Sequence, residues 1–279
     1  MISPATHTWL CGKKRIHIPL SHPLILGILN VTPDSFSDGG KFAQTSDAVR
    51  QGILLLQAAD GVDVGGESTR PGAEGLSAKE ERARVIPVLK ELRKEMPTAF
   101  LSVDTYKAEV AKAAIGEAGV EVVNDVGGGA WDPGMWGTIA STGVGYVCMH
   151  AGGKPKVMQK NPSYQNVVAE VGDILRKKLG KMIEGGIPQE RVVLDVGIGF
   201  GKSTEHNRAL LEADWTDLGR PVLWGLSRKS FLATTQLEKK LKDRDEALDW
   251  WHRELLRKSG GMVWRVHDPE RVRKGAGLL

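Results

Sequence analysis

Short apolar runs rich in Val, Ile and Leu recur along the chain, each bounded by polar or glycine-rich segments. Runs of four to six such residues are typical of strands that are covered on both faces of a sheet. The pattern therefore predicts strands at residues 24–29, 61–65, 99–103, 120–123, 144–149, 191–194, 221–226 and 262–266.

The segments between these runs have the periodicity and the capping residues of helices. They predict helices at residues 46–59, 77–95, 106–117, 133–141, 163–184, 204–213, 244–258 and 269–274. Strict alternation of strand and helix in a chain of 279 residues favours an α/β fold of the closed (β/α)8 TIM-barrel type. An open, doubly wound sheet is the alternative with the same alternation.

The N-terminal residues follow a different pattern from the rest of the chain. Residues 8–20 read TWLCGKKRIHIPL, and polar and apolar positions alternate around Cys11-Gly12-Lys13, as in a small hairpin. We expect this β-hairpin to cap the bottom of the barrel. No repeat, linker or low-complexity stretch divides the chain, so we expect a single domain over residues 1–279.

Composition adds bounds on compartment and partners. The longest apolar runs are shorter than the roughly 18 residues that span a membrane, and the N-terminus lacks the apolar core of a signal peptide. Cys11 and Cys148 are the only cysteines and form no metal-ligand pattern. The net charge is +4, with basic and acidic residues interspersed. We therefore expect a cytoplasmic protein without a membrane or nucleic-acid partner.

Polar and ionisable residues stand where each predicted strand ends. A barrel gathers its strand ends onto one face, which is where barrel enzymes place their chemistry. A single Asp at such a point is equally well explained as a helix N-cap, but eight coincidences are harder to explain in that way. The residues in question are Asn30, 67–72, Asp104, Asn124 with Asp125, His150, Asp195, 227–229 and Arg265 with His267 and Asp268.

The residue types at these ends suit a particular ligand. Asp104, Asn124 and Asp195 offer carboxylates and an amide for a flat heterocycle, whose buried polar atoms must each be paired. Lys229 and Arg265, with the nearby His267, supply positive charge for a phosphate or another anionic leaving group. A further cation, Arg70, lies on a loop with Pro71 and Gly72 and could close over the substrate; a surface salt bridge is the competing interpretation.

Several catalytic motifs are absent. The stretch VGIGFGKS has Val196 where a Walker A loop needs glycine, and the glycine-rich turns lack the GxGxxG spacing of a dinucleotide fold. No HxH, HExxH, Cys/His cluster or GxSxG elbow occurs, which argues against a zinc enzyme and a serine hydrolase. A Mg²⁺ ion shared with a diphosphate would need only one or two oxygen ligands and would leave little trace.

With these residues in view, the chain closely resembles the dihydropteroate synthase family from about residue 9 to residue 268. The motifs occur in the family's order and at its spacings: GILNVTPDSFSDGG, DVGGESTRPGA, SVDT, NDVGGG, DVGIGFGK, GLSRKSFL and RVHD. The resemblance implies a pterin-binding TIM barrel and a transferase of folate biosynthesis. Its reaction joins 6-hydroxymethyl-7,8-dihydropterin diphosphate to p-aminobenzoate and releases 7,8-dihydropteroate and diphosphate.

The resemblance also implies roles for individual residues. The pterin would be held by Asp104, Asn124, Asp195 and Lys229, with Met149 and Phe200 packing on it. The diphosphate would meet Asn30, Arg70, Arg265 and His267, and Asn30 would bind Mg²⁺ as the metal ligand. The p-aminobenzoate would lie near Asp34, Phe36, Thr69, Pro71, Phe200, Lys229 and Ser230. The residues expected to be catalytic are Arg70, Lys229, Arg265 and His267.

Two loops, 31–40 and 68–75, would then be mobile covers over the site, and an SN1-like departure of diphosphate is the mechanism we favour. Two departures from the family pattern stand out: Val196 replaces the proline of the usual DPG turn, and residues 244–258 are unusual for the family. Helices in this part form the family's dimer interface, so we expect a homodimer with Trp250 in the interface.

Two other functions fit part of this pattern. A methyltransferase barrel that acts on methyltetrahydrofolate shares the fold and the pterin pocket, although Lys229 and the STRP loop argue against it. A catalytically weak pterin-binding protein is the other alternative, because of the altered turn at Val196.

Overall fold

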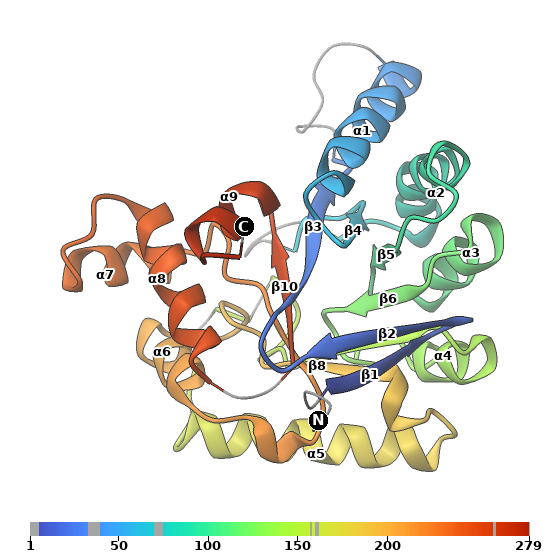
Figure 1. Cartoon of the computed structure of the whole chain (residues 1–279). Coiled ribbons are helices and arrows are strands. Elements are labelled where there is room, and N and C mark those ends of the chain that lie inside the picture. Colours follow the sequence, from blue (N-terminus) through green and yellow to red (C-terminus); the bar gives the residue numbers. More distant parts are fainter. Residues whose placement is uncertain are drawn as a thin grey trace, which may run out of the picture.

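In the computed structural model, eight parallel strands form a closed barrel (Figure 1). The structure describes residues 6–32, 40–69, 75–156, 158–159, 162–258 and 261–278. Around the barrel the strands follow the order β10-β3-β4-β5-β6-β7-β8-β9. Their bounds are β3 Leu24–Asn30, β4 Gly61–Gly65, β5 Leu101–Asp104, β6 Val122–Asp125, β7 Gly145–Met149, β8 Val192–Asp195, β9 Val222–Trp224 and β10 Met262–Val266. The predicted TIM barrel is confirmed.

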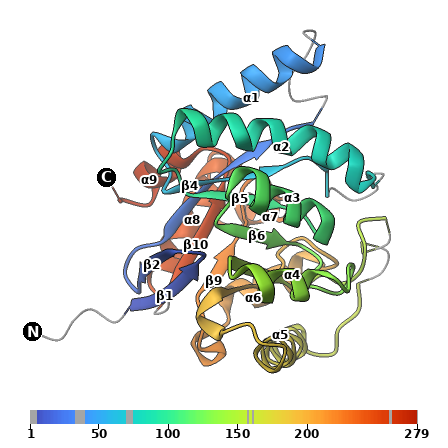
Figure 2. The ribbon, with the colours of Figure 1, turned by 90° about the vertical axis from the view of Figure 1, so that its right-hand side faces the viewer.

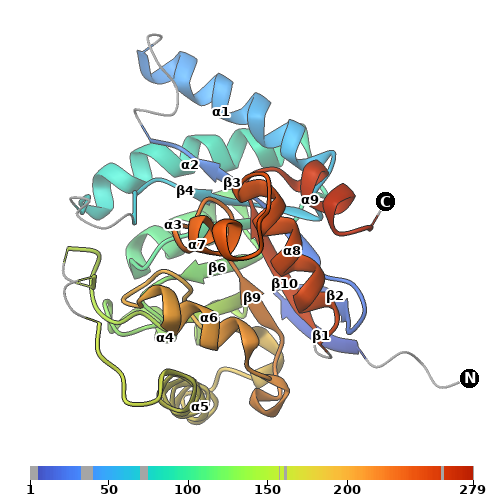
Figure 3. The same ribbon diagram turned by 90° about the vertical axis from the view of Figure 1, so that its left-hand side faces the viewer.

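Helices surround the barrel, and each lies between two consecutive strands or follows the last one. Figure 2 shows α2, α3 and α4 on one side, and Figure 3 shows α6, α7 and α8 on the other. The helices are α1 Gly40–Leu56, α2 Ala78–Glu95, α3 Ala108–Ala118, α4 Met135–Thr142, α5 Val167–Glu184, α6 Thr204–Glu212, α7 Phe231–Glu238, α8 Arg244–Leu256 and α9 Pro269–Gly275, with 3-10 turns η2 Gln189–Arg191 and η3 Thr216–Leu218.

Capping residues explain where several helices begin. Ser77 accepts from the backbone N–H of Glu80, whose carboxylate accepts from the Ser77 backbone N–H in return, so α2 starts with a capping box. Asn166 caps α5 and Asp243 caps α8 through their side chains. None of the described helices is long and apolar enough to cross a membrane.

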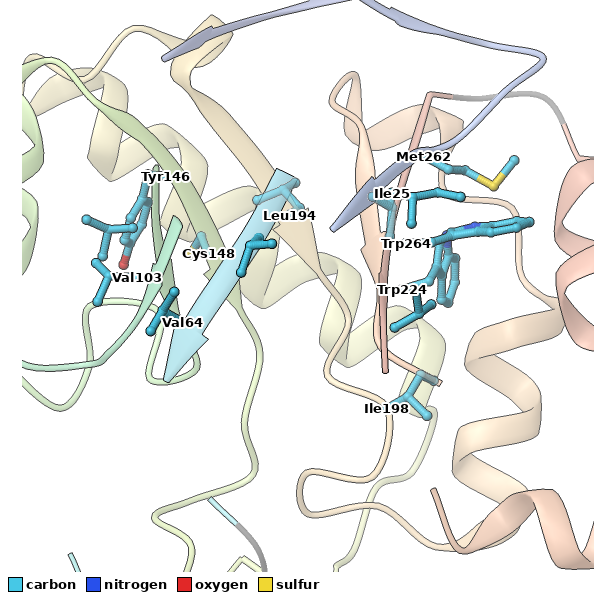
Figure 4. Close-up of a cluster of buried hydrophobic side chains, with 14 of the residues drawn as sticks. Ile25, Val64, Val103, Tyr146, Cys148, Leu194, Ile198, Trp224, Met262 and Trp264 are labelled. Atoms are coloured by element: carbon cyan, nitrogen blue, oxygen red, sulfur yellow. The ribbon is translucent and has the colours of Figure 1, made fainter. Parts of the chain in front are cut away.

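Alternation along the strands separates two cores. Outward side chains such as Val64, Val103 and Leu194 pack against the helices (Figure 4). Inward side chains at the start of the strands, including Leu26 and Val147, form a second core inside the barrel. Because the side-chain period of a strand is two, the next inward positions along the strands lead to the opposite, carboxyl end of the barrel.

The N-terminal hairpin closes the end of the barrel where the strands begin. Strands β1 Thr6–Cys11 and β2 Lys14–Pro19 pair in antiparallel fashion. Trp9 and Ile18 are completely buried in the inner core, and the Trp9 indole donates to the carbonyl of Arg191, just before β8. The predicted cap at the bottom of the barrel is therefore confirmed, and the cavity of the barrel is accessible from the other end.

Two helix predictions differ from the structure. Helix α7 was not predicted, because its apolar residues do not recur on one face, and Leu237 is 78% exposed. Helix α1 begins at Gly40, six residues before the predicted start at Ser46. The other helices begin and end within about four residues of the predicted bounds, which is the usual uncertainty of helix ends in sequence analysis.

Candidate active site

A cavity of about 390 Å³ opens at the carboxyl ends of the barrel strands. Most of the residues that the sequence assigned to the site line this cavity, although they lie far apart in the chain. They are Asn30, Thr69, Asp104, Asn124, Met149, Asp195, Phe200, Lys229, Arg265 and His267. The barrel thus brings the predicted pterin and diphosphate residues together.

The remaining assigned residues do not line the cavity or cannot be placed. Ser230 is exposed at the start of α7 and is not part of the cavity wall. Asp34, Phe36, Arg70 and Pro71 lie outside the described residues, as do most of the two loops expected to cover the site.

Arg265 links two aspartates inside the cavity. Its Nε donates to Asp63 Oδ2 at 2.5 Å, and its Nη2 donates to Asp104 Oδ2 at 2.7 Å. Burial raises the pKa of Asp104 to about 7, even though the Arg265 charge acts to lower it. Near neutral pH the Asp104 carboxyl can therefore gain or lose a proton.

Asp195 and Lys229 are two further ionisable residues of the cavity wall. Burial raises the pKa of Asp195 to about 6 and lowers that of Lys229 to about 8, and each charge partly offsets the shift of the other. The Lys229 ammonium lies 4.2 Å from the centre of the Phe200 ring. This contact closes the space between Lys229 and Phe200, so the slot for a flat ring with donor and acceptor atoms is the part of the cavity lined by Asp104, Asn124, Asp195 and Lys229.

The turn after β8 is tightly held despite the departure at Val196. The Gly197 N–H donates to Asp195 Oδ1 at 2.6 Å, and Val196 is completely buried. Gly197 has a φ of +72°, and a Cβ at this position would lie 1.8 Å from the carbonyl oxygen of His150. Only glycine fits there.

Lys202 supports the same turn from behind. It is 4% exposed, and its ammonium lies 3.0 Å from His150 Nδ1 and donates to the Phe200 carbonyl oxygen at 3.0 Å. Burial lowers the pKa of Lys202 to about 7 and that of His150 to about 3. His150, placed at a strand end by the sequence, therefore serves this buried contact, and it does not line the cavity.

The rim of the cavity carries groups suited to an anion. His267 Nδ1 lies 3.0 Å from Ser227 Oγ, which orients the imidazole. Asn30 is exposed at the end of β3. The described residues contain no cluster of three His, Cys, Asp or Glu side chains that could hold a metal, so a Mg²⁺ ion here would depend on the oxygen of Asn30 and on ligand phosphates.

The root of the second loop is anchored by a buried ionic cluster. The Lys107 ammonium binds both Glu67 and Glu81, and the Tyr106 hydroxyl donates to Glu67 Oε1 at 2.8 Å. Because Glu67 also accepts from the backbone N–H of Leu76, this cluster fixes both ends of the loop that contains Thr69.

Sequence reasoning missed Asp63, Ser102 and Lys202. Asp63 and Ser102 lie in the middle of strands, away from the strand ends where the sequence places the candidate residues. A charged residue in the middle of the apolar run GVDVG was the available signal for Asp63, because a buried charge needs partners. The contacts of Lys202 join two separate loops and leave no local pattern.

Comparison with known proteins gives the same family along most of the chain. Residues 26–267 match the family model described as "Pterin binding enzyme". The dihydropteroate synthase of Escherichia coli (strain K12) is 43% identical over 218 residues, which are 77% of this chain and 76% of that enzyme. The dihydropteroate synthase of Haemophilus influenzae is 39% identical over 254 residues, 90% of each chain.

Solved structures of similar enzymes share the fold. Xanthomonas albilineans dihydropteroate synthase with 4-aminobenzoic acid has a TM-score of 0.84 at 35% identity, and the match covers 98% of this chain and 97% of that one. The same enzyme in complex with 7,8-dihydropteroate has a TM-score of 0.80 at 34% identity, with 97% of each chain covered.

Proposed function

The chain belongs to the dihydropteroate synthase family of pterin-binding transferases, and from this premise we propose which of its residues carry each part of the reaction. The substrates are 6-hydroxymethyl-7,8-dihydropterin diphosphate and p-aminobenzoate, and the products are 7,8-dihydropteroate and diphosphate. The matched relatives are dihydropteroate synthases, so the methyltransferase alternative is set aside. The whole chain, residues 1–279, acts as one pterin-binding domain.

The observation that carries the proposal is the slot in which two carboxylates, an amide and the Lys229 ammonium line one cavity. Asp104, Asn124 and Asp195 accept from the ring N–H groups of the pterin, and Lys229 donates to its acceptor atoms. Met149, which is almost completely buried, packs on the ring. The slot has room and partners for a flat, polar heterocycle.

The diphosphate leaves toward the cationic rim. The bond between the methylene carbon and the diphosphate oxygen breaks, and its electron pair departs with diphosphate. Arg265 and His267, joined by Arg70 from the covering loop, stabilise the developing negative charge. When bound through Asn30, Mg²⁺ supplies further charge neutralisation at the phosphate oxygens.

The arylamine then forms the new bond. The electron-rich ring supports the cationic methylene, the nitrogen of p-aminobenzoate donates its lone pair to that carbon, and a proton is lost from the nitrogen. We assign the p-aminobenzoate side of the site to Thr69 and Phe200, together with Asp34, Phe36, Pro71 and Ser230. Closure of the two loops excludes water, which would otherwise capture the cation. This SN1-like order requires no strong general base.

The experiment is an assay of diphosphate release by the purified chain, with and without p-aminobenzoate and Mg²⁺. We expect release to require both, and to stop when the metal is removed with a chelator and return when Mg²⁺ is added. Release without p-aminobenzoate would contradict the proposed condensation. Binding of 6-hydroxymethylpterin without any diphosphate release would identify a catalytically weak pterin-binding protein.

We also propose a homodimer in the cytoplasm, with α7 and α8 at the interface. The Trp250 ring on α8 packs at 4.8 Å on Trp251 and lies 4.7 Å from the Lys239 ammonium, while Leu237 on α7 is exposed. An exposed apolar residue and a partly covered indole on two helices that pack together are suited to a second subunit. Sedimentation at micromolar concentration should give twice the mass of one chain, and a monomer would refute the proposal.

A further inference from the structure

Asp63 lies halfway along β4 inside the barrel, and it is completely buried. It is not part of the wall of the active-site cavity, so its carboxylate does not meet a ligand there. A buried carboxylate is costly unless it is fully paired. The partners of Asp63 therefore indicate why a charge stands at this position.

Three donors from three other strands converge on this carboxylate. Ser102 Oγ donates to Oδ1 at 2.5 Å. Asn124 Nδ2 and Arg265 Nε donate to Oδ2 at 2.8 and 2.5 Å. The last two partners line the cavity, whereas Ser102 does not. Asp63 thus lies directly behind two residues of the binding site.

The contact determines which way the Asn124 amide faces. A carboxylate that already receives a guanidinium N–H and a hydroxyl can only accept hydrogen bonds, so it selects the NH₂ end of the amide. The Oδ1 atom of Asn124 is thereby left for the cavity, and none of the described residues donates to it. Without this partner the amide could turn over at little cost and present a donor instead.

We propose that Asp63 is a positioning residue that sets the specificity of the pterin slot: it holds the Asn124 carbonyl oxygen toward the ring and fixes the guanidinium plane of Arg265. The slot then selects a heterocycle with an N–H donor at the Asn124 position and rejects one with an acceptor there, because a buried pair of acceptors is strongly unfavourable. This inference rests on the proposed function of the cavity.

The test compares two variants at Asp63 with a control at Ser102. Asp63→Asn keeps an oxygen at the Oδ2 position, since Ser102 Oγ can accept from the new amide, so the KM for the pterin diphosphate should rise less than about fivefold. Asp63→Ala removes the acceptor. It should raise the KM for the pterin diphosphate roughly 10- to 100-fold, with little change in the KM for p-aminobenzoate. Ser102→Ala should change either KM by less than about twofold.

These outcomes separate positioning from general damage. A loss of folded enzyme lowers the apparent kcat and leaves both KM values unchanged. If Asp63→Ala keeps a normal KM for the pterin substrate, or if both KM values rise equally, the inference is wrong. If the wild-type chain releases no diphosphate, the proposed function fails. The inference is then tested by the dissociation constant of 6-hydroxymethylpterin, measured by titration calorimetry on the same variants.

A measurement on the wild-type chain tests the inference even if the Asp63 variants do not fold. The side-chain NH₂ signal of Asn124, identified by its loss in Asn124→Ala, should exchange slowly with solvent, both before and after 6-hydroxymethylpterin is added. Slow exchange is expected because the NH₂ group donates to buried Asp63 in both states. An NH₂ group that exchanges rapidly in the free protein, or that becomes protected only when ligand binds, would overturn the inference.

Discussion

The ionisable residues of the cavity have pKa values displaced toward neutrality. Burial raises the pKa of Asp104 to about 7 and of Asp195 to about 6, and it lowers that of Lys229 to about 8. In the proposed pterin site, each carboxyl accepts more strongly from ring N–H groups when it is ionised, and Lys229 must be protonated to carry its positive charge. The pH range in which Asp104 and Asp195 are ionised and Lys229 is protonated is therefore narrow.

We predict a bell-shaped pH dependence of kcat/KM for the pterin diphosphate. The value should fall below about pH 7, as Asp104 and then Asp195 gain a proton, and above about pH 8, as Lys229 loses one. Steady-state rates between pH 5 and 9.5 measure both limbs. The control is Lys229→Arg, which stays charged and should lose the alkaline limb. A flat profile between pH 6 and 9 would contradict the assignment.

Single substitutions should divide the assigned residues into two groups. Asp104→Ala and Lys229→Ala remove groups inside the cavity, and each should lower kcat/KM by roughly 10²- to 10³-fold. Ser230→Ala should have a mild effect, because Ser230 is exposed outside the cavity wall. The measurement is kcat/KM for both substrates. Near-normal turnover by Asp104→Ala would contradict the pterin assignment.

At the scale of elements, helix α8 has an unusual buried contact. His252 is completely buried and stacks on the Trp264 indole of β10, with ring centres 4.1 Å apart and planes at 16°. Among the described residues, neither of its ring nitrogens has a hydrogen-bond partner. Burial lowers the pKa of His252 to about 3, so the imidazole is neutral in the folded protein.

We predict that His252→Leu stabilises the protein, by about 1 kcal/mol near neutral pH, because it removes two unpaired polar atoms from the core. The gain should grow on acidification. Between the pKa of about 6.5 in the unfolded chain and about 3 in the folded one, only the unfolded wild-type chain binds the proton. In this range the free energy of unfolding of the wild-type chain therefore decreases as the pH is lowered, by up to about 1.4 kcal/mol per pH unit.

Denaturant unfolding at pH 7.5 and 5.5 measures this difference. The control is His22→Leu, at an exposed histidine, which measures the effect of the same substitution outside the core. An equal difference between wild type and His252→Leu at both pH values would show that His252 takes up its proton in the folded state as well.

The strands and helices of this chain could be predicted where a local sequence pattern is enough to identify them. Buried parallel strands are short apolar runs, so residues such as Asp104 and Asp195 were found at strand ends and correctly placed around one cavity. Helix α7 was missed because it has no apolar stripe and packs instead on the following helix α8, where the Trp251 indole donates to Thr235 Oγ1. Lys202 was missed because its contacts join two separate loops, whereas Asp63 was missed although a charged residue within an apolar run was a local signal.

At the scale of the whole molecule, the two ends of the barrel have different tasks. The carboxyl end carries the cavity, whereas the other end is filled by the hairpin, where Trp9 packs edge-on against Phe100 at 6.0 Å. In barrel enzymes generally, residues at the bottom contribute to stability and residues at the top to catalysis. Changes at the hairpin should therefore affect folding and leave the chemistry intact.

We predict that Trp9→Ala lowers the free energy of unfolding by roughly 3–5 kcal/mol, the usual cost of removing a fully buried Trp side chain. Both KM values of the folded enzyme should stay within about twofold of wild type. Trp9→Phe, which keeps a ring and loses the hydrogen bond to Arg191, should cost less. Thermal unfolding with parallel kinetics tests this, and a large change in either KM would show coupling between the two ends.

The hairpin that closes one end of the barrel also determines how substrates reach the cavity. A barrel closed at one end leaves a common passage for substrates and products, past the exposed Asn30 and the rim around it. Asn124, Met149 and Asp195 are nearly inaccessible at the inner part of that passage. A ligand that binds at the inner part leaves the outer part of the passage open for the second substrate. A substrate bound at the outer part would close the passage to the inner one. With the proposed assignment of these inner residues to the pterin, we expect the pterin to bind before p-aminobenzoate.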